Sequence, residues 1–467
     1  MTELWYWNAP RLSAAFRSRE ISPVEVAKAL LARIAALDVK TNAFCLIDEI
    51  TTLAQARASE ERWAKGAPLS PLDGVPVAVK DILLTRGWPT LRGSRTIDPA
   101  QPWEHDAPAV ARLREAGAVL LGKVASPDHG WKGVTDSPLC GITRNPWNLD
   151  KTPGGSSGGS SAALAARLTP LALGTDGGGS IRIPAGFSGV FGIKPNFGRV
   201  PAWPVSPFGT LSHTGPMSRD VEGSAMLLDV MARPDARDWQ ALPPPGRSFA
   251  DGLRDGVRGK RIAFSPAMGF AKNVEPQVAA LVAAAAKRFS ELGADVEEVD
   301  PPGGDPVEIF RTLWWAGAGF LFGAAAAEKK ALLDPGLAAI AQEGAAIPIR
   351  HYIEANVARG AYASQMRVFM EQYDFLLTPS LAVTAFDVGK ISPYADNGSW
   401  PSWTPFSYPF NLTQQPAASV PCGRTAAGLP VGLQIVGRHY DDWGVLQAAQ
   451  AYEGIDPHFD DIPEGFA

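Results

Sequence analysis

The feature that most restricts the fold of this chain is a series of short apolar segments separated by stretches with helical spacing. In the first segment Val75, Val77 and Val79 alternate as in a strand, and Lys80 closes it on the opposite face. The pattern predicts further strands at 119–121, 171–173, 190–193, 261–264, 296–299, 375–378, 418–421 and 432–436. Short apolar strands that alternate with helices are typical of a largely parallel sheet with helices on both faces.

Helix signals occupy the intervals between these strands. Ser22 and Glu25 fit a capping box, and apolar residues follow them at helical spacing. The pattern predicts further helices over 106–116 and 275–292, each followed by a glycine. The stretch 233–259 is rich in proline, glycine and charge, and we interpret it as a surface connection within a domain.

Composition excludes several classes of protein. The 43 Lys and Arg residues against 48 Asp and Glu give a net charge of −5, which argues against a broad nucleic-acid surface. Cys45, Cys140 and Cys422 form no C-x-x-C pair, so neither a zinc ribbon nor a disulfide framework is expected. The first residues do not resemble a signal peptide, and the apolar stretch 314–327 is too short to span a bilayer. The prediction is a cytoplasmic protein without a membrane partner.

Two glycine-rich runs lie between regular elements. The run at 154–161 reads GGSSGGSS and precedes an Ala-rich helical stretch, and the run at 174–184 reads GTDGGGSIRIP and follows a predicted strand. Glycines in such positions let the backbone approach another group closely. Neither run ends in the Gly-Lys-Ser/Thr of a P-loop, so nucleotide binding is not expected.

The first run also fits the G-x-S-x-G pattern of a nucleophile elbow, with Ser156 as its serine. An elbow follows a buried apolar strand, whereas the residues before this run, 148–153, read NLDKTP. An elbow also needs a histidine base. Of the six histidines only His213 lies in a suitable loop, and we interpret it as structural. The elbow is therefore not favoured.

The second run places Ser180 just before a helix. Pro184 lacks an N–H and is tolerated only in a first helical turn, so this helix must begin between Ser180 and Ile183. Free N–H groups in the preceding turn can then converge on one point, as in an oxyanion hole beside a nucleophile. The groups concerned belong to Gly177, Gly178, Gly179 and Ser180.

A serine nucleophile needs a base, and the ionisable residue at a strand end of the same predicted sheet is Lys80. Burial can lower a lysine pKa from about 10.4 toward about 7–8, so that the neutral amine accepts a proton. Asp81 follows directly in the sequence. If its carboxylate faced the amine, it would keep the lysine charged and oppose this role.

Together these segments resemble the amidase signature family of serine hydrolases. Its three hallmarks occur in order as VAVKD with Lys80, GGSSGGS with Ser156, and TDGGGSIRIP with Ser180. Further similar segments cover nearly the whole chain: LGK at 121–123, NPW at 145–147, GIKP at 192–195, GPM at 215–217, AASVP at 417–421 and GLQIVG at 432–437.

The resemblance implies an α/β fold, with a large mixed, mostly parallel sheet sandwiched between helices. One domain would span residues 1–467, with the signature core at about 65–220 and a more variable, pocket-forming region at about 233–410.

The family uses a Ser-cisSer-Lys triad, and the resemblance assigns its members by position. Ser180 is expected to be the nucleophile, and Ser156, preceded by a cis peptide in the family, to relay the proton to neutral Lys80. The resemblance further implies three residues that hold the glycine turns: Ser157, Asp176 and Arg182. It implies no cofactor and no metal.

The implied activity is hydrolysis of an amide, anilide or carbamate through an acyl-enzyme, as in aryl acylamidases or urethanases, with some esterase activity. The expected partner is a small-molecule substrate, and the expected state is a monomer or homodimer. Aromatic residues are expected to form the pocket entrance and walls, which favours an apolar substrate. They are Trp314, Trp315, Phe320, Phe322, Trp400, Trp403, Phe406, Tyr408 and Phe410.

Three departures from the family affect the choice of substrate. Ile183 stands where amidotransferase subunits usually carry glutamine, and Gly177 stands where threonine or isoleucine is common. The segment 123–129 also diverges from the family pattern near the acyl pocket. Two alternatives stay open: a glutaminase-type subunit of a tRNA-dependent amidotransferase, which needs partner subunits, and a non-catalytic binding protein, against which the intact triad argues.

Overall fold

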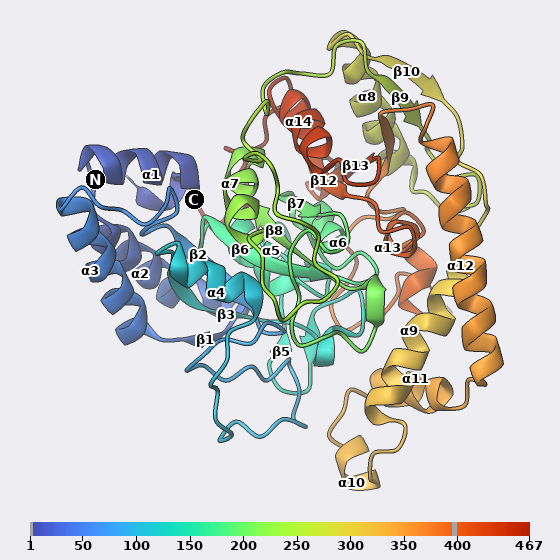
Figure 1. The fold of residues 1–467 in the computed structure, drawn as a ribbon, viewed down its shortest axis with the longest axis horizontal. Coiled ribbons are helices and arrows are strands. Elements are labelled where there is room, and N and C mark those ends of the chain that lie inside the picture. Colours follow the sequence, from blue (N-terminus) through green and yellow to red (C-terminus); the bar gives the residue numbers. More distant parts are fainter. Residues whose placement is uncertain (1–2, 395–398) are drawn as a thin grey trace.

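One large sheet forms the centre of the protein (Figure 1). The structure, a computed structural model, describes residues 3–394 and 399–467. The strands of the sheet are β1 (Phe44–Ile47), β2 (Pro76–Lys80), β3 (Val119–Val124), β6 (Leu171–Asp176), β7 (Phe191–Lys194), β8 (His213–Ser218), β9 (Arg261–Phe264), β10 (Asp295–Glu298), β11 (Phe375–Pro379), β12 (Ala417–Arg424) and β13 (Pro430–Gly437). Within the described ranges these 11 strands follow the order β1-β3-β2-β6-β8-β7-β12-β13-β11-β9-β10. A separate hairpin joins β4 (Asp136–Ser137) to β5 (Gly141–Ile142).

The sheet mixes parallel and antiparallel pairs. β2 pairs parallel with β3 and β6, and β9 pairs parallel with β10 and β11. The strands between these two groups pair antiparallel, as β1 does with β3. The predicted α/β architecture, a large mixed sheet flanked by helices, is confirmed, and its parallel pairing is confined to the two groups.

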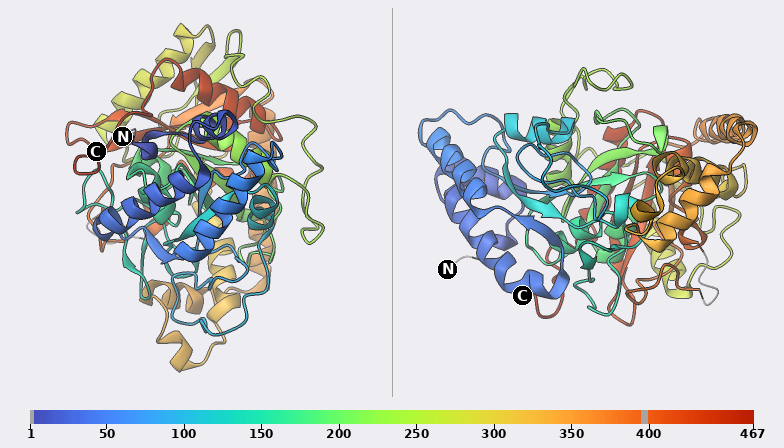
Figure 2. Two further views of the ribbon diagram at one scale, coloured as in Figure 1. Left: turned by 90° about the vertical axis from the view of Figure 1, so that its left-hand side faces the viewer. Right: turned by 90° about the horizontal axis from the view of Figure 1, so that it is seen from below.

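Helices surround the sheet (Figure 2). They are α1 (Ala9–Ser18), α2 (Pro23–Thr41), α3 (Glu49–Ala64), α4 (Pro108–Glu115), α5 (Gly158–Ala165), α6 (Arg182–Ser188), α7 (Val221–Met231), α8 (Pro276–Glu291), α9 (Val307–Phe322), α10 (Ala327–Lys330), α11 (Pro335–Ala345), α12 (Ile349–Phe369), α13 (Pro409–Leu412) and α14 (Asp442–Glu453). The predicted capping box begins α2, where Ser22 Oγ accepts from Glu25 N at 3.2 Å. Within residues 3–394 and 399–467, no helix is long and apolar enough to cross a membrane.

The core consists of two large apolar clusters. One packs the sheet against α1, α2 and α4 near the N-terminus and against α7, α8 and α14. The other is rich in aromatic side chains and lies among α9, α11, α12 and the segment around Trp400. Both chain ends lie beside the N-terminal helices, away from α9–α12 (Figures 1 and 2), and Lys40 Nζ donates to Gly465 O at 2.9 Å.

Candidate active site

Lys80, the last residue of β2, is fully buried among hydroxyl groups. Its Nζ lies 2.7 Å from Ser156 Oγ, 2.8 Å from Ser157 Oγ and 2.8 Å from Thr175 Oγ1. Ser157 Oγ also donates to Thr175 O at 3.2 Å and accepts from Thr175 N at 3.2 Å. The structure therefore brings Lys80, Ser156 and Ser157 together as predicted, and adds Thr175, which the sequence analysis did not identify.

Asp81 does not face the Lys80 amine. Its Oδ1 lies 3.5 Å from Lys123 Nζ, and its Oδ2 accepts from Gly93 N at 3.3 Å. Burial lowers the pKa of Lys80 well below its ordinary value, and the negative charge of Asp176 only opposes this shift. The condition under which Asp81 would keep Lys80 charged is therefore not met, because the Asp81 carboxylate faces Lys123.

The loop that carries Ser156 is held on both sides by Thr135. The peptide bond between Gly155 and Ser156 is cis, as the resemblance implied. Thr135 Oγ1 donates to Gly154 O at 2.8 Å and accepts from Gly158 N at 3.1 Å, where α5 begins. Because of these two contacts, the first glycine run is a fixed turn that leads into α5.

The second glycine run connects β6 to α6. β6 ends at Asp176 and α6 begins at Arg182, which confirms the predicted helix start. Ser180 lies between them, and its carbonyl accepts from Ser157 N at 3.1 Å, so the two runs are in direct contact. The Ser180 side chain is largely buried and lines the same cavity as Ser156.

Close packing explains the glycines of this turn. A Cβ on Gly177 would lie 2.6 Å from the Trp314 ring, and one on Gly178 would lie 2.6 Å from the Trp400 ring. Gly179 has a φ of +125°, a conformation that L side chains rarely adopt. Aromatic side chains therefore pack directly against the turn, and any larger residue at Gly177 or Gly178 would displace it.

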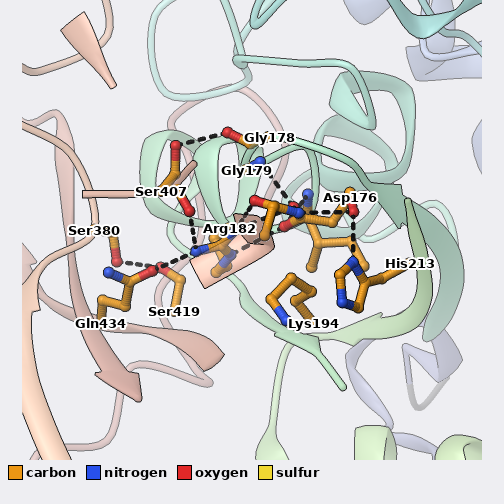
Figure 3. A network of polar contacts seen from close by, with 12 residues as sticks. Asp176, Gly178, Gly179, Arg182, Lys194, His213, Ser380, Ser407, Ser419 and Gln434 are labelled. Atoms are coloured by element: carbon orange, nitrogen blue, oxygen red, sulfur yellow. Dashed lines mark hydrogen bonds and ion pairs between the residues drawn. The ribbon is translucent and has the colours of Figure 1, made fainter. Parts of the chain in front are cut away.

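A buried ion pair between Asp176 and Arg182 fixes the turn (Figure 3). Arg182 Nε and Nη2 each lie 3.0 Å from an Asp176 oxygen, and both side chains are fully buried. Arg182 also donates to Gln434 Oε1 at 2.8 Å and to Asn411 Oδ1 at 2.7 Å. Burial would raise the pKa of Asp176, but Arg182 holds it below its ordinary value. Asp176 and Arg182, two of the residues implied to hold the glycine turns, are in direct contact, and Asn411 and Gln434 join them from distant segments.

The Asp176 carboxylate also occupies one of the four N–H groups that the sequence predicted for an oxyanion hole. Gly179 N donates to Asp176 Oδ1 at 2.7 Å, so its N–H is not free for a substrate. The prediction for the Gly179 N–H is therefore wrong, because Asp176 uses that group to hold the turn. Within the described ranges, three predicted donors keep an N–H without a protein partner: Gly177, Gly178 and Ser180.

Replacing Asp176 by alanine should destabilise the protein strongly, because Arg182 would remain buried without its counter-charge. Breaking a buried ion pair in this way costs about 3–5 kcal/mol. Urea unfolding of the variant measures the loss, and turnover should fall with it as the glycine turn loosens. Glu222→Ala breaks the exposed pair with Arg254 and serves as the control, with an expected loss below about 1 kcal/mol. An Asp176→Ala protein as stable as the wild type would contradict this role of the ion pair.

Ser156 and Ser180 open into a cavity of about 470 Å³. Its walls come from the segment after β2, the Pro-rich loop 201–208 and α9. Mainly apolar side chains line it, among them Ile82, Leu83, Leu84, Trp203, Val205, Phe208, Trp314, Phe320 and Leu321.

Only part of the predicted aromatic wall lines this cavity. Trp314 and Phe320 do, and Trp203 and Phe208, which the sequence analysis did not identify, contribute from the Pro-rich loop. The remaining predicted aromatics are buried in the second apolar cluster instead: Trp315, Phe322, Trp400, Trp403, Phe406, Tyr408 and Phe410. Trp400 still contacts the glycine turn, because its ring packs against Gly178.

His213 is structural, as interpreted from the sequence. It begins β8 opposite Asp176, and its Nδ1 lies 2.8 Å from Leu211 O and 3.2 Å from Asp176 O. Burial, together with the charge of Lys194, keeps its pKa well below the ordinary value. His213 does not line the cavity of Ser156 and Ser180.

Comparison with known proteins places these features in context. A sequence model of the family described as Amidase matches residues 25–446. The chain is 36% identical to an acylamidase of Rhodococcus erythropolis, over 99% of this chain and 98% of that protein. It is 38% identical to a glutamyl-tRNA(Gln) amidotransferase subunit of Myxococcus xanthus, over 95% of this chain and 96% of that protein. A solved bacterial aryl acylamidase of the amidase signature enzymes superposes with a TM-score of 0.92 at 31% identity, covering 98% of this chain and 99% of that one.

Proposed function

The chain belongs to the amidase family, and on that premise we propose that it hydrolyses an amide-type C–N bond through an acyl-enzyme on Ser180. The observation that carries this proposal is the buried contact of 2.7 Å between Lys80 Nζ and Ser156 Oγ, beside the cavity that Ser180 lines. A non-catalytic binding protein would have no use for a buried amine of lowered pKa at this position.

The contacts of Lys80 with three hydroxyl groups support proton transfer from Ser156 to the lysine. A neutral lysine has two N–H donors and one lone pair. Ser157 Oγ gives its own proton to Thr175 O at 3.2 Å, so it accepts an N–H from Lys80, and Thr175 Oγ1 accepts the other. The lone pair is then left for Ser156, whose hydroxyl can donate to Lys80 while it accepts the proton of Ser180.

In the proposed reaction Ser180 Oγ attacks the substrate carbonyl as its proton passes through Ser156 to Lys80. The N–H groups of Gly177, Gly178 and Ser180 stabilise the oxyanion, and each such donor contributes ~100- to 1,000-fold in rate. The proton returns to the nitrogen of the leaving amine when the C–N bond breaks. Water then hydrolyses the acyl-enzyme through the same groups in reverse.

The cavity supports a substrate with an apolar or aromatic part. Its walls combine aliphatic residues after β2 with Trp203, Phe208 and Trp314. Burial of apolar substrate surface against them favours anilides, alkyl amides and carbamates over small polar amides. A turnover screen over anilides, aliphatic amides, carbamates and glutamine tests this order, and glutamine as the best substrate would refute it.

The second candidate function is that of a glutaminase-type component of an amidotransferase. The similarity to the Myxococcus xanthus protein favours it. Such a component would release ammonia from glutamine and pass it to partner subunits. Affinity purification from its own cells, followed by a glutaminase assay, distinguishes the two functions, because only the amidotransferase requires partner subunits to copurify.

We expect chelators to leave activity unchanged. The proposed mechanism polarises the carbonyl with backbone N–H groups and moves the proton with Ser156 and Lys80, so no step needs a metal. Hydrolysis of an anilide before and after dialysis against EDTA measures this. Activity that disappears on dialysis and returns with a divalent cation would contradict the mechanism.

A further inference from the structure

Arg92 is a cation of the cavity wall that the proposed mechanism does not use. It lines the cavity of Ser156 and Ser180, on the loop between β2 and α4. Its guanidinium makes no hydrogen bond or ion pair with any residue in 3–394 or 399–467. Arg182, by contrast, uses its donors on Asp176 and neighbouring acceptors. The five N–H donors of Arg92 are therefore available to a bound molecule.

The backbone at Arg92 is firmly held. Its carbonyl accepts from His129 N at 2.8 Å, and its φ of +56° is uncommon for a residue with a side chain. The next residue, Gly93, donates to Asp81 and packs so tightly that a Cβ there would lie 2.3 Å from Ser126 O. The arginine thus starts from a defined point on the cavity wall, which is the arrangement a ligand-binding side chain requires.

A second cavity adjoins the first at this arginine. This outer cavity has a volume of about 310 Å³ and shares four wall residues with the inner one: Leu84, Arg92, His129 and Leu321. The remainder of its wall includes Thr90, Thr96, Ile97, Gln101, Trp103, Phe322 and Lys329. Arg92 and His129 therefore stand at the junction of the two cavities.

The junction is positively charged. Arg92 lies at the junction, Lys329 lines the outer cavity, and among the described residues no aspartate or glutamate lines either cavity. The carboxylate nearest to His129 is that of Asp128, whose Oδ1 lies 3.9 Å from His129 Nε2 and whose Oδ2 accepts from Asp334 N. Burial, with the charges of Arg92 and Lys329, lowers the pKa of His129 to about 3, so the imidazole is neutral. The nearby carboxylate of Asp81 is taken by Lys123. Burial also lowers the pKa of Arg92, and the negative charge of Asp81 opposes this shift. A carboxylate bound at the guanidinium would act in the same direction as Asp81.

We propose that Arg92 binds a carboxylate group of the substrate at the junction of the inner and outer cavities. The preferred substrates are then amides with an apolar body and one acidic group, on either the acyl chain or the leaving amine. A single guanidinium matches the two oxygens of a carboxylate in a bidentate contact. The inference rests on the proposed function, since it places the scissile amide at Ser180 in the inner cavity.

Three anilides separate the possibilities: hexananilide, its counterpart with a terminal carboxylate on the acyl chain, and the hexanoyl amide of 4-aminobenzoate. We expect the wild type to prefer one of the two carboxylates over the neutral anilide. Arg92→Gln should lower kcat/KM for that carboxylate by about 10- to 100-fold, mainly through KM, and leave the neutral anilide unchanged. Arg92→Lys should recover only part of the loss, because an ammonium cannot form the bidentate contact.

Arg95→Gln is the matched control, because Arg95 lies on the same loop and is exposed outside both cavities. It should retain the preference. Equal losses on all three substrates with Arg92→Gln would show a structural role and overturn the proposal, as would a wild type with no preference for either carboxylate.

Calorimetry of the anilides binding to the Ser180→Ala protein tests the role of Arg92 without turnover. The carboxylated anilide should bind more tightly than the neutral one, and adding Arg92→Gln should remove the difference. If the wild type cleaves none of the amides yet this difference is found, the proposed function fails and the carboxylate site stands. If the protein cleaves and binds the carboxylated and neutral anilides equally well, the proposed carboxylate site is refuted and the proposed function stands.

Discussion

Ser180→Ala is expected to abolish amide hydrolysis, with a loss on the order of 10⁵- to 10⁶-fold in kcat. The hydroxyl is the proposed site of the covalent bond, and the proposed mechanism gives Ser156 the role of proton relay and not of nucleophile. The fold should not change, because the Ser180 side chain makes no hydrogen bond to any residue that the structure describes. Steady-state kinetics on an anilide and labelling with a fluorophosphonate both measure the loss.

Ser212→Ala provides the control, because Ser212 lines the same cavity without contacting Lys80. That variant should keep both turnover and fluorophosphonate labelling. Mass spectrometry of the labelled wild type should place the adduct on the peptide with Ser180. An adduct on Ser156 in the Ser180→Ala protein would instead support the elbow interpretation of the first glycine run.

The site was largely predictable because its parts are local in sequence. Pro184 limits where the helix after the second glycine run begins, and α6 begins at Arg182 as this limit requires. Lys80 ends a Val-rich segment that the alternation predicts to be a strand, and the structure buries every residue of that strand, Lys80 included. Which N–H groups stay free was not predictable, because it depends on where the Asp176 carboxylate points, and it points at Gly179.

The sheet and the cavity show where sequence patterns fail. β8 (His213–Ser218) was not predicted, since Gly215 and Pro216 are typical of turns and a strand buried on both faces shows no alternation. Trp203 and Phe208 lie in a Pro-rich loop whose path is set by tertiary contacts. Trp400 is close to the site in space, but it packs against Gly178 of the glycine turn and does not line the cavity. Spacing along the chain does not report which side of a turn an aromatic ring occupies.

Lys80→Ala should lower kcat by ~100- to 10,000-fold, the usual contribution of a general base. Lys80→Arg should be no more active than the alanine variant, because a guanidinium stays protonated and cannot accept the proton from Ser156. Its larger head would also have to fit among Ser156, Ser157 and Thr175, which already contact the amine at 2.7–2.8 Å. Near wild-type activity in the arginine variant would show that Lys80 is only a structural cation.

The pH dependence of the wild type follows from the same amine. Burial disfavours the ammonium form and lowers the pKa of Lys80 well below its ordinary value, with Asp176 opposing the shift. Only the deprotonated amine accepts the proton, so kcat/KM should be low below this lowered pKa, rise tenfold per pH unit as pH approaches it, and level off above it. Asp81 should not shift this rise of kcat/KM with pH, because its carboxylate faces Lys123.

The residual rate of Lys80→Ala should lack this pH-dependent limb, since the titrating group is gone. A profile from pH 5 to 10 for both proteins measures this; an identical limb in the alanine variant would assign the titration to another group and remove Lys80 from the role of base.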